Sequence, residues 1–143
     1  MATDPARTEI TLGNDPRLLP GVAAVVAFSA ARAGFAARDQ ETLATAVLNA
    51  CRETFALLDG AHSAIGLGIA DSPGCIEVTI EHSGEPLPTA GLDSFCAATA
   101  EEGAAGISRA LLSTAVDRVK YDTHEGRSRM TLIKYRSDAR PEG

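Results

Sequence analysis

The sequence predicts an α+β fold of the two-layer sandwich kind, in which a mixed, mostly antiparallel sheet carries its helices on one face. Stretches that alternate apolar and polar residues, as half-buried strands do, occur near both ends of the chain and in its middle. Between them lie stretches whose apolar residues recur at helical spacing. The strands come in hairpin-like clusters separated by helices, and this order favours helices packed on one side of a sheet.

The composition suits one globular domain with an aliphatic core. The chain has 143 residues, of which 45% are hydrophobic and only 4% aromatic. Its formal net charge of −6 disfavours nucleic acid and anionic membranes as partners. It shows no apolar leader and no apolar run that could span a bilayer, so we expect a cytoplasmic protein. We expect a flexible N-terminus over 1–7, a single domain over 8–136 and a flexible tail over 137–143.

The first half of the chain is predicted to contain one strand and two helices. The residues Thr8–Leu12 alternate with period two, and a Gly-Asn-Asp-Pro turn follows them. A helix is predicted over Leu19–Ala33, with Gly34 as its C-terminal stop. A second helix is predicted from Asp39 to about Leu58, with Asp39 as its N-cap.

The second half is predicted to contain two hairpins. Alternating runs over 65–69 and 76–80 flank an Asp-Ser-Pro-Gly turn over 71–74, which predicts the first hairpin. Residues 81–105 lose periodicity, and so long an irregular stretch inside a compact domain is usually functional or mobile. The remaining predicted elements are a helix over about 107–116 and strands over about 116–122 and 129–136, the strands joined by a turn at 124–126.

The cysteines and the late basic residues have simple interpretations. The three cysteines have neither CxxC spacing nor a nearby His ladder for a metal, so we interpret them as buried, reduced thiols. Most of the basic residues near the C-terminus fall on the last predicted strand, where solvated strand faces are the simplest interpretation. The residues concerned are Cys51, Cys75 and Cys96, and Arg127, Arg129, Lys134, Arg136 and Arg140.

Asn49 is the residue of the second predicted helix that most needs a reason. Asparagine is a poor residue for a helix interior, because its amide competes with the backbone for hydrogen bonds. Helical spacing places it with Thr45, away from an apolar stripe that includes Val47 and Cys51. On this helix alone a solvated polar position is the simpler interpretation.

The order of elements, with Asn49 in the second helix, Gly84 after the second hairpin strand and Gly106 opening the third helix, resembles the GHKL superfamily of ATPases, which have the histidine kinase-like ATPase fold. Within that superfamily the chain is most similar to the small anti-sigma factor serine/threonine kinases. The resemblance covers the chain from about Thr8 to Tyr135. It implies a site for ATP and magnesium, and in the family such proteins commonly form homodimers.

The first motif of the family is E-x-x-x-N-A, and here Asn49-Ala50 matches its end. The resemblance implies that Asn49 is the ligand of the magnesium ion that bridges the ATP phosphates. Thr45 stands where the family has its Glu base. A threonine hydroxyl is no base near neutral pH, so no catalytic residue is assigned here.

The other two motifs are also kept only in part. In the family's D-x-G-x-G, His82 replaces the Asp that binds the adenine amino group, Gly84 is kept, and Pro86 replaces the second Gly. In G-x-G at the third helix, whose N–H groups hold phosphate, Gly106 is kept and Ser108 replaces the second Gly. The resemblance thus implies cofactor contacts at Asn49, His82, Gly84, Gly106 and Ser108.

Three functions remain open at the level of sequence. The first is an anti-sigma-factor-like regulatory protein with a degenerate ATP site, which exchanges a sigma factor for an anti-anti-sigma factor of the STAS fold by partner switching. The second is an active serine/threonine protein kinase that phosphorylates that STAS partner with ATP and magnesium. The third is an α+β domain that binds another small ligand in a remodelled pocket, with His82 and Cys75 near its mouth.

Overall fold

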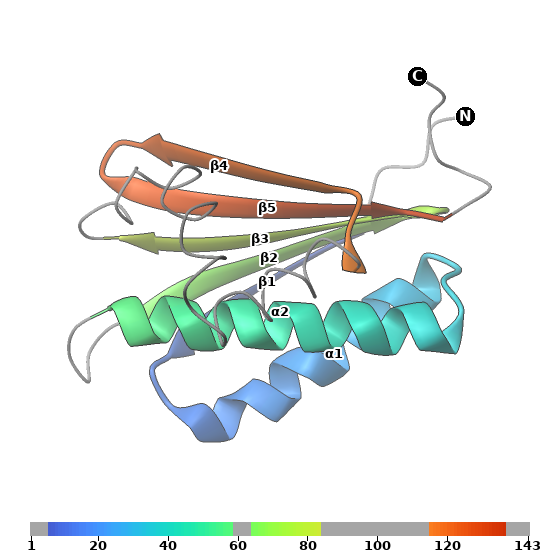
Figure 1. Ribbon diagram of the computed structural model, residues 1–143, viewed down its shortest axis with the longest axis horizontal. Coiled ribbons are helices and arrows are strands. Elements are labelled where there is room, and N and C mark those ends of the chain that lie inside the picture. The colour runs from blue at the N-terminus through green and yellow to red at the C-terminus, as the bar shows by residue number, and fades with distance from the viewer. Residues whose placement is uncertain (1–5, 59–63, 84–114, 137–143) are drawn as a thin grey trace, which may run out of the picture.

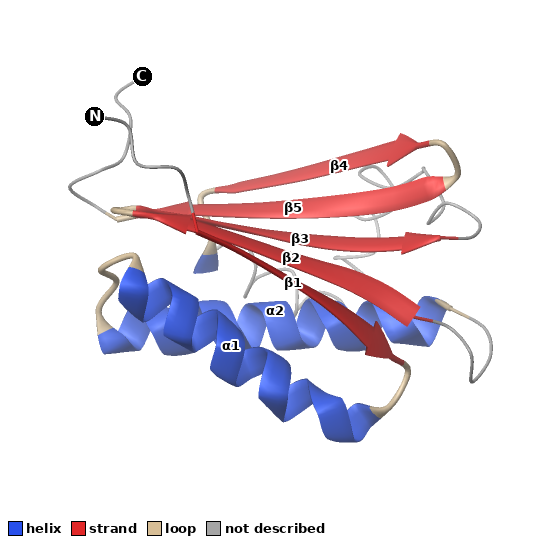
Figure 2. Cartoon of the chain, turned by 180° about the vertical axis from the view of Figure 1, so that it is seen from behind, coloured by secondary structure: helices blue, strands red, loops and turns tan. Residues whose placement is uncertain are grey.

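The computed structural model describes residues 6–58, 64–83 and 115–136 of the chain. These residues form two layers, a five-stranded sheet and a pair of helices (Figure 1). The helices α1 (Leu19–Arg32) and α2 (Ala37–Leu57) lie side by side and cover the same face of the sheet (Figure 2). The predicted α+β class, with helices on one face of a sheet, is therefore confirmed.

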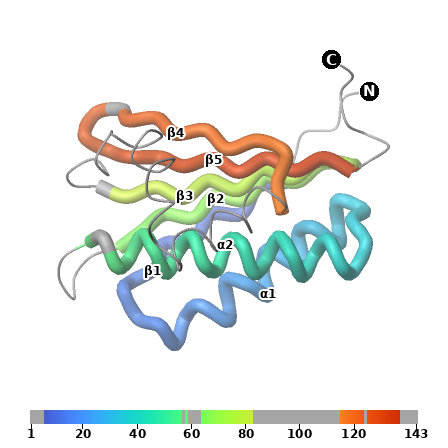
Figure 3. Tube along the Cα trace, in the orientation of Figure 1, coloured from blue at the N-terminus to red at the C-terminus, as the bar shows by residue number. Residues whose placement is uncertain are grey.

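The sheet has the strand order β1-β2-β3-β5-β4, so β3 is its central strand (Figure 3). Every neighbouring pair is antiparallel. The sheet was predicted to be mixed, but the strands that the structure describes contain no parallel pair. The strands are β1 (Ala6–Gly13), β2 (Ala64–Ser72), β3 (Cys75–Ser83), β4 (Arg118–His124) and β5 (Arg127–Tyr135).

Both hairpins have two-residue turns, shorter than the sequence predicts. Asp71 and Ser72 still pair with β3, which leaves only Pro73 and Gly74 in the first turn. In the second turn Glu125 and Gly126 have φ angles of 51° and 76°. Two successive positive φ angles are the geometry of a type I′ turn, whose twist matches that of the flanking strands.

The second helix begins two residues earlier than predicted, and its predicted N-cap is wrong. Ala36 occupies the cap position with an extended backbone, φ −66° and ψ 156°, and it supplies no side-chain cap. The side-chain amide of Gln40 instead donates a hydrogen bond to the carbonyl oxygen of Phe35 at 2.8 Å. Asp39 lies in the first turn, where its negative charge complements the helix dipole.

The core lies between the helix pair and the inner face of the sheet. The strands β2 and β3 bury alternate side chains against the helices, as period-two patterning requires. The largest fully buried side chains include Val26 of α1 and Leu43 and Val47 of α2. Their partners on the sheet are aliphatic as well, chiefly Ile65, Leu67, Ile69, Ile76, Val78, Ile80 and Leu132.

One end of the helix layer is tied to the sheet by an ion pair and two backbone hydrogen bonds. The Arg32 guanidinium donates to both carboxylate oxygens of Asp71, at 3.1 and 2.6 Å. The Gly74 N–H donates to the Ala33 carbonyl, and the Arg136 N–H donates to the Gly74 carbonyl, each at 2.9 Å. These contacts connect the end of α1, the β2–β3 turn and the end of β5.

Gly34 is favoured at this junction by its backbone conformation. Its φ of 96° is in the left-handed region that side chains disfavour. A Cβ atom at this position would also displace the guanidinium of Arg136, which lies at the end of a flexible side chain. The predicted helix stop at Gly34 is thus confirmed.

The third predicted helix, over 107–116, lies almost wholly outside the described residues, although Ala115 is helical. The irregular stretch predicted over 81–105 begins with three residues that still belong to β3, and the rest lies outside the described part. Among the described helices none is long and apolar enough to cross a membrane.

We expect Arg32→Ala to lower the melting temperature by several degrees, and by more than Asp71→Ala does. The Asp71 side chain is only 5% exposed, so removal of Arg32 leaves a buried carboxylate without its partner. The Arg32 side chain is 43% exposed, so removal of Asp71 leaves a guanidinium that water can solvate. Thermal unfolding of both variants and of the double variant measures the coupling, and equal effects of the two single changes would contradict this asymmetry.

The surroundings of the two described cysteines lead to a second prediction. Cys51 is a buried residue of α2, and burial raises the pKa of its thiol to about 12. Cys75 is only half-buried at the start of β3, contrary to the expectation of a buried thiol. In the folded protein we expect iodoacetamide to modify Cys75 and to spare Cys51 until the protein unfolds. Peptide mapping after timed alkylation checks this, and early modification of Cys51 would show that the core opens locally.

Candidate functional site

The middle of α2 carries a polar flank that is neither in the core nor fully solvated. Asn49 is half-buried, and Thr42 and Glu53, at helical spacing on either side of it, are half-buried as well. Thr45 is exposed on the adjoining back of the helix. The structure therefore confirms that Asn49 lies off the buried stripe of α2.

The Asn49 amide is held by a neighbour on its own helix. The Arg52 guanidinium donates to Asn49 Oδ1 at 3.2 Å. This oxygen is the atom that would have to ligate magnesium, and a guanidinium beside it repels a divalent cation. Magnesium is usually bound through carboxylates together with phosphates. Within the described part of the chain no group of three or more His, Cys, Asp or Glu residues could hold a metal. In this structure Asn49 Oδ1 is engaged by Arg52, so a magnesium ion at this oxygen would require the exposed Arg52 side chain to move away.

His82 lies next to the end of β3 and faces the helix layer. It pairs with Ile65 of β2 on one side and with Ser128 of β5 on the other. His82 is 3% exposed and Ser128 is 5% exposed. Among the described residues neither ring nitrogen of His82 has a hydrogen-bond partner, and neither does Ser128 Oγ. Buried polar atoms in folded proteins almost always have partners, so this pair of side chains is a candidate polar subsite.

The two predicted site residues on described elements share one side of the sheet. Figure 1 shows that α2 and β3 end at the same end of the molecule. Asn49 lies in the second half of α2, and His82 is the last residue but one of β3. The hydrogen bond that Asn49 makes is to Arg52 and not to β3. The other predicted contact residues, Gly84, Gly106 and Ser108, lie outside the described residues.

The structure separates His82 from Cys75, which the third hypothesis placed together at a pocket mouth. Cys75 is the first residue of β3 and His82 its last but one, a distance of about 23 Å at the usual rise per residue. They are seven positions apart, an odd offset, so their side chains also point to opposite faces of the sheet. The two residues cannot line one pocket, and this part of the hypothesis is wrong.

Sequence reasoning missed Ser128. It is a small polar residue at an inward-facing position of β5, directly beside His82. The alternation in Ser-Arg-Met-Thr-Leu contained the signal, because Ser128 is in phase with the buried Met130 and Leu132.

Two of the late basic residues form ion pairs. Arg127 and Arg129 both contact Glu81 Oε1, at 3.4 and 3.2 Å.

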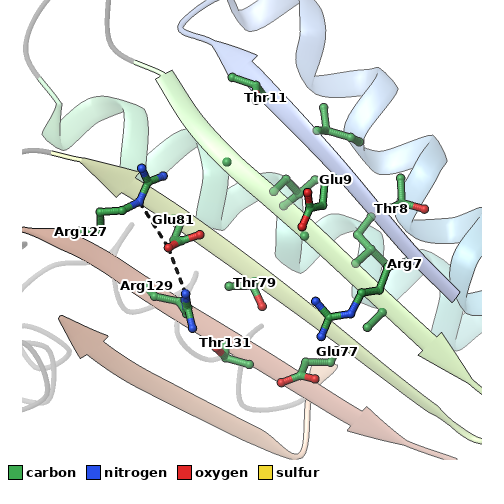
Figure 4. A pocket seen from close by; sticks show the side chains of 16 residues that line it. Arg7, Thr8, Glu9, Thr11, Glu77, Thr79, Glu81, Arg127, Arg129 and Thr131 are labelled. Atoms are coloured by element: carbon green, nitrogen blue, oxygen red, sulfur yellow. Dashed lines mark hydrogen bonds and ion pairs between the residues drawn. The ribbon is translucent and has the colours of Figure 1, made fainter. Parts of the chain in front are cut away.

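A hollow of about 400 Å³ lies on the other face of the sheet, away from the helices (Figure 4). None of the predicted site residues lines it. Asn49 and His82 and this hollow are therefore on opposite sides of the sheet.

No protein-family model matches the chain, and no curated protein matches it either.

We expect His82→Phe to raise the free energy of unfolding of the protein alone by about 1 kcal/mol, since a buried polar group without partners costs free energy of this order. The aromatic ring keeps most of the side-chain volume. Urea denaturation measures the change, and Ser128→Ala is expected to shift stability in the same direction, because Ser128 Oγ also lacks a partner among the described residues. A clear loss of stability in His82→Phe would instead show that the imidazole has a structural partner in the folded chain.

Proposed function

We propose that the protein is a regulatory binding protein of the anti-sigma type, built on a GHKL-like domain whose nucleotide site has degenerated. The observation that carries the proposal is the pair of changes at the first motif on α2. An exposed Thr45 stands where the family has its Glu base, and the Arg52 guanidinium donates a hydrogen bond to Asn49 Oδ1. The two-layer arrangement of helices on an antiparallel sheet supports it. The polar pair at His82 and Ser128 is consistent with a remnant of the base-binding end of such a site.

Partner switching requires only differences in binding free energy. A sigma factor held on the protein is released when a STAS-domain antagonist binds the same surface, or a coupled one, more tightly. Each factor of ten in relative affinity corresponds to about 1.4 kcal/mol, so a few contacts decide which partner is bound. No phosphoryl transfer is needed. The proposed partners place this action in the cytoplasm, and a homodimer, as in similar proteins, is part of the proposal.

An active protein kinase is the alternative. It is favoured by the retained Asn49 and by the half-buried Glu53 one turn further along α2, a carboxylate on the same flank of the helix. Phosphoryl transfer depends mainly on positioning and on charge stabilisation. The loss of a general base therefore costs roughly a hundred- to ten-thousand-fold in rate and need not abolish transfer.

We expect titration calorimetry with magnesium-ATP to show no binding at micromolar concentrations, and Asn49→Ala to leave this result unchanged. The physical reason is that the amide oxygen of Asn49 is engaged by Arg52 and that no carboxylate stands at position 45. The matched gain-of-function variant combines Thr45→Glu, which supplies a carboxylate, with Arg52→Ala, which removes the hydrogen bond to Asn49 Oδ1. This variant is expected to gain binding of magnesium-ATP.

The binding part of the proposal is tested separately. Purified sigma factors are expected to bind the wild-type protein without nucleotide, and a STAS-domain antagonist is expected to displace them in the same assay. Micromolar binding of magnesium-ATP, together with transfer of labelled phosphate to the STAS protein, would falsify the degenerate-site proposal and establish the kinase. Failure of every sigma factor to bind would refute the anti-sigma role itself.

A further inference from the structure

The helix α1 is apolar on every side, including the side that faces away from the molecule. Between Leu19 and Arg32 the one polar side chain is that of Ser29, which is 1% exposed. The exposed positions of α1 before Arg32 therefore carry apolar side chains alone. A helix that is apolar all round is normally buried all round, so part of α1 lacks the cover that such a helix usually has.

The uncovered residues form one stripe at helical spacing, in which large and small residues are mixed. Phe28 is 64% exposed and Leu18 is 46% exposed, and they are the large apolar side chains that the described residues leave exposed. The other members of the stripe are small, or half-buried in the case of valine. The stripe, called the α1 face below, consists of Leu18, Gly21, Ala24, Val25, Phe28 and Ala31.

Gly21 is not required by the fold of a single chain. Its φ is not positive, and a Cβ atom there would meet nothing within 4 Å. Glycine in a helix costs about 1 kcal/mol relative to alanine. The fold of one chain thus gives no reason for this cost, and the missing side chain leaves open space on the α1 face.

The ring of Phe28 is held in place on the surface. The Arg32 guanidinium lies 5.4 Å from the centre of the ring, and the same guanidinium donates two hydrogen bonds to Asp71. A cation over an aromatic ring is attracted to it. A side chain that is fixed before its partner arrives loses less conformational entropy on binding. Phe28 is therefore suited to anchor a contact.

The α1 face suits a partner that carries the same charge as the chain itself. Copies of a molecule with a net charge of −6 repel each other. The six residues of the α1 face carry no charge. The arginines at its two ends are neutralised within the chain, Arg17 by Asp15 and Arg32 by Asp71. Two copies can therefore meet here without bringing uncompensated like charges together.

The α1 face is complementary to itself when two copies run antiparallel. Its positions are symmetric about a point between Ala24 and Val25. In such a pair Phe28 falls opposite the partner's Gly21, and Leu18 falls opposite the partner's Ala31. A two-fold interface requires one patch to fit itself, and here each large side chain meets a small residue. This match selects a second copy over an unrelated apolar helix.

The edge of the sheet beside α1 is also open in the described part of the chain. There β1 is the outermost strand and pairs with β2 alone. Figure 2 shows α1 and β1 on the same margin, in front of α2 and of the other strands. Standard interfaces bury roughly 800 Å² per partner, which is more than one helix face offers. The adjoining margin of β1 supplies further area for a second copy.

We propose that the α1 face joins two copies of the chain across a two-fold axis between Ala24 and Val25, with each Phe28 seated against the partner's Gly21. A homodimer is part of the proposed function, whereas the surface assigned to it rests on α1 and its margin. Neither nucleotide nor a sigma factor takes part in the contact. The surface can therefore be tested even where the anti-sigma role fails.

The test is sedimentation equilibrium of the whole protein over a wide range of concentration, without added ligand. We expect a reversible equilibrium between monomer and dimer. Phe28→Ala removes the anchor and Gly21→Phe places two rings in the same space, so each is expected to weaken dimerisation at least about tenfold. The double variant exchanges the large and the small position and is expected to restore dimerisation, which a merely structural defect would not do.

The matched control is Ala56→Phe, which adds the same ring at an exposed position of α2 outside the α1 face and should leave dimerisation unchanged. Circular dichroism shows whether each variant is folded. If Gly21→Phe does not fold, Gly21→Leu replaces it in the single and the double variant.

Three results overturn the proposal. The first is a wild-type protein that stays monomeric at every concentration. The second is a dimer that both single variants leave intact, because the copies would then meet elsewhere. The third is a double variant that stays as weakly associated as the single variants, because the antiparallel match would then be wrong. Failure of sigma factors to bind, in contrast, refutes the anti-sigma role and leaves the sedimentation result unchanged.

Discussion

The ion pair between Arg32 and Asp71 is the contact on which the arrangement of the two layers depends. Asp71 is buried at the end of β2, where a carboxylate is stable only with a partner. Arg32, at the last turn of α1, supplies that partner, and its guanidinium also lies 5.4 Å from the centre of the Phe28 ring. The backbone bonds from Ala33 through Gly74 to Arg136 reinforce the same junction.

This junction divides the molecule into two ends with different characters. At the Asp71 end, the charged and backbone groups that join α1 to the sheet have hydrogen-bond partners. At the opposite end of β3, His82 and Ser128 are buried without partners among the described residues. Local departures from the rules of stability are expected where function requires them. Under the proposed function, the ligand-binding end of the domain lies at His82.

The two faces of the sheet serve different purposes. Apart from Asp71, His82 and Ser128, the buried side chains of β2, β3 and β5 on the inner face are mainly aliphatic and are accounted for by packing against α1 and α2. The outer face carries charged side chains of β1, β3 and β5 around a hollow that the described residues leave open. In the proposed role of partner exchange, such a separation lets one surface change its occupant while the core stays the same.

Sequence by itself determined the class of the fold and most of its elements. Period-two alternation located β2, β3 and β5, and helical spacing located α1 and α2, because burial on one side imposes those periods on the residues. Gly34 predicted the end of α1, because few other residues adopt the positive φ angle that it has there. The N-cap of α2 was misjudged because Gln40 bonds back to Phe35, a choice that local propensity does not reveal.

Only the tertiary structure decided how distant residues meet. The pairing of Arg32 with Asp71, 39 residues apart, follows from how α1 crosses the end of β2. The hydrogen bond from Arg52 to Asn49 depends on side-chain rotamers that helical spacing permits without specifying. The neighbours of His82 follow from strand order and register, which place β3 between β2 and β5. Periodicity records which side of an element is buried, whereas the identity of its neighbours is set by long-range pairing.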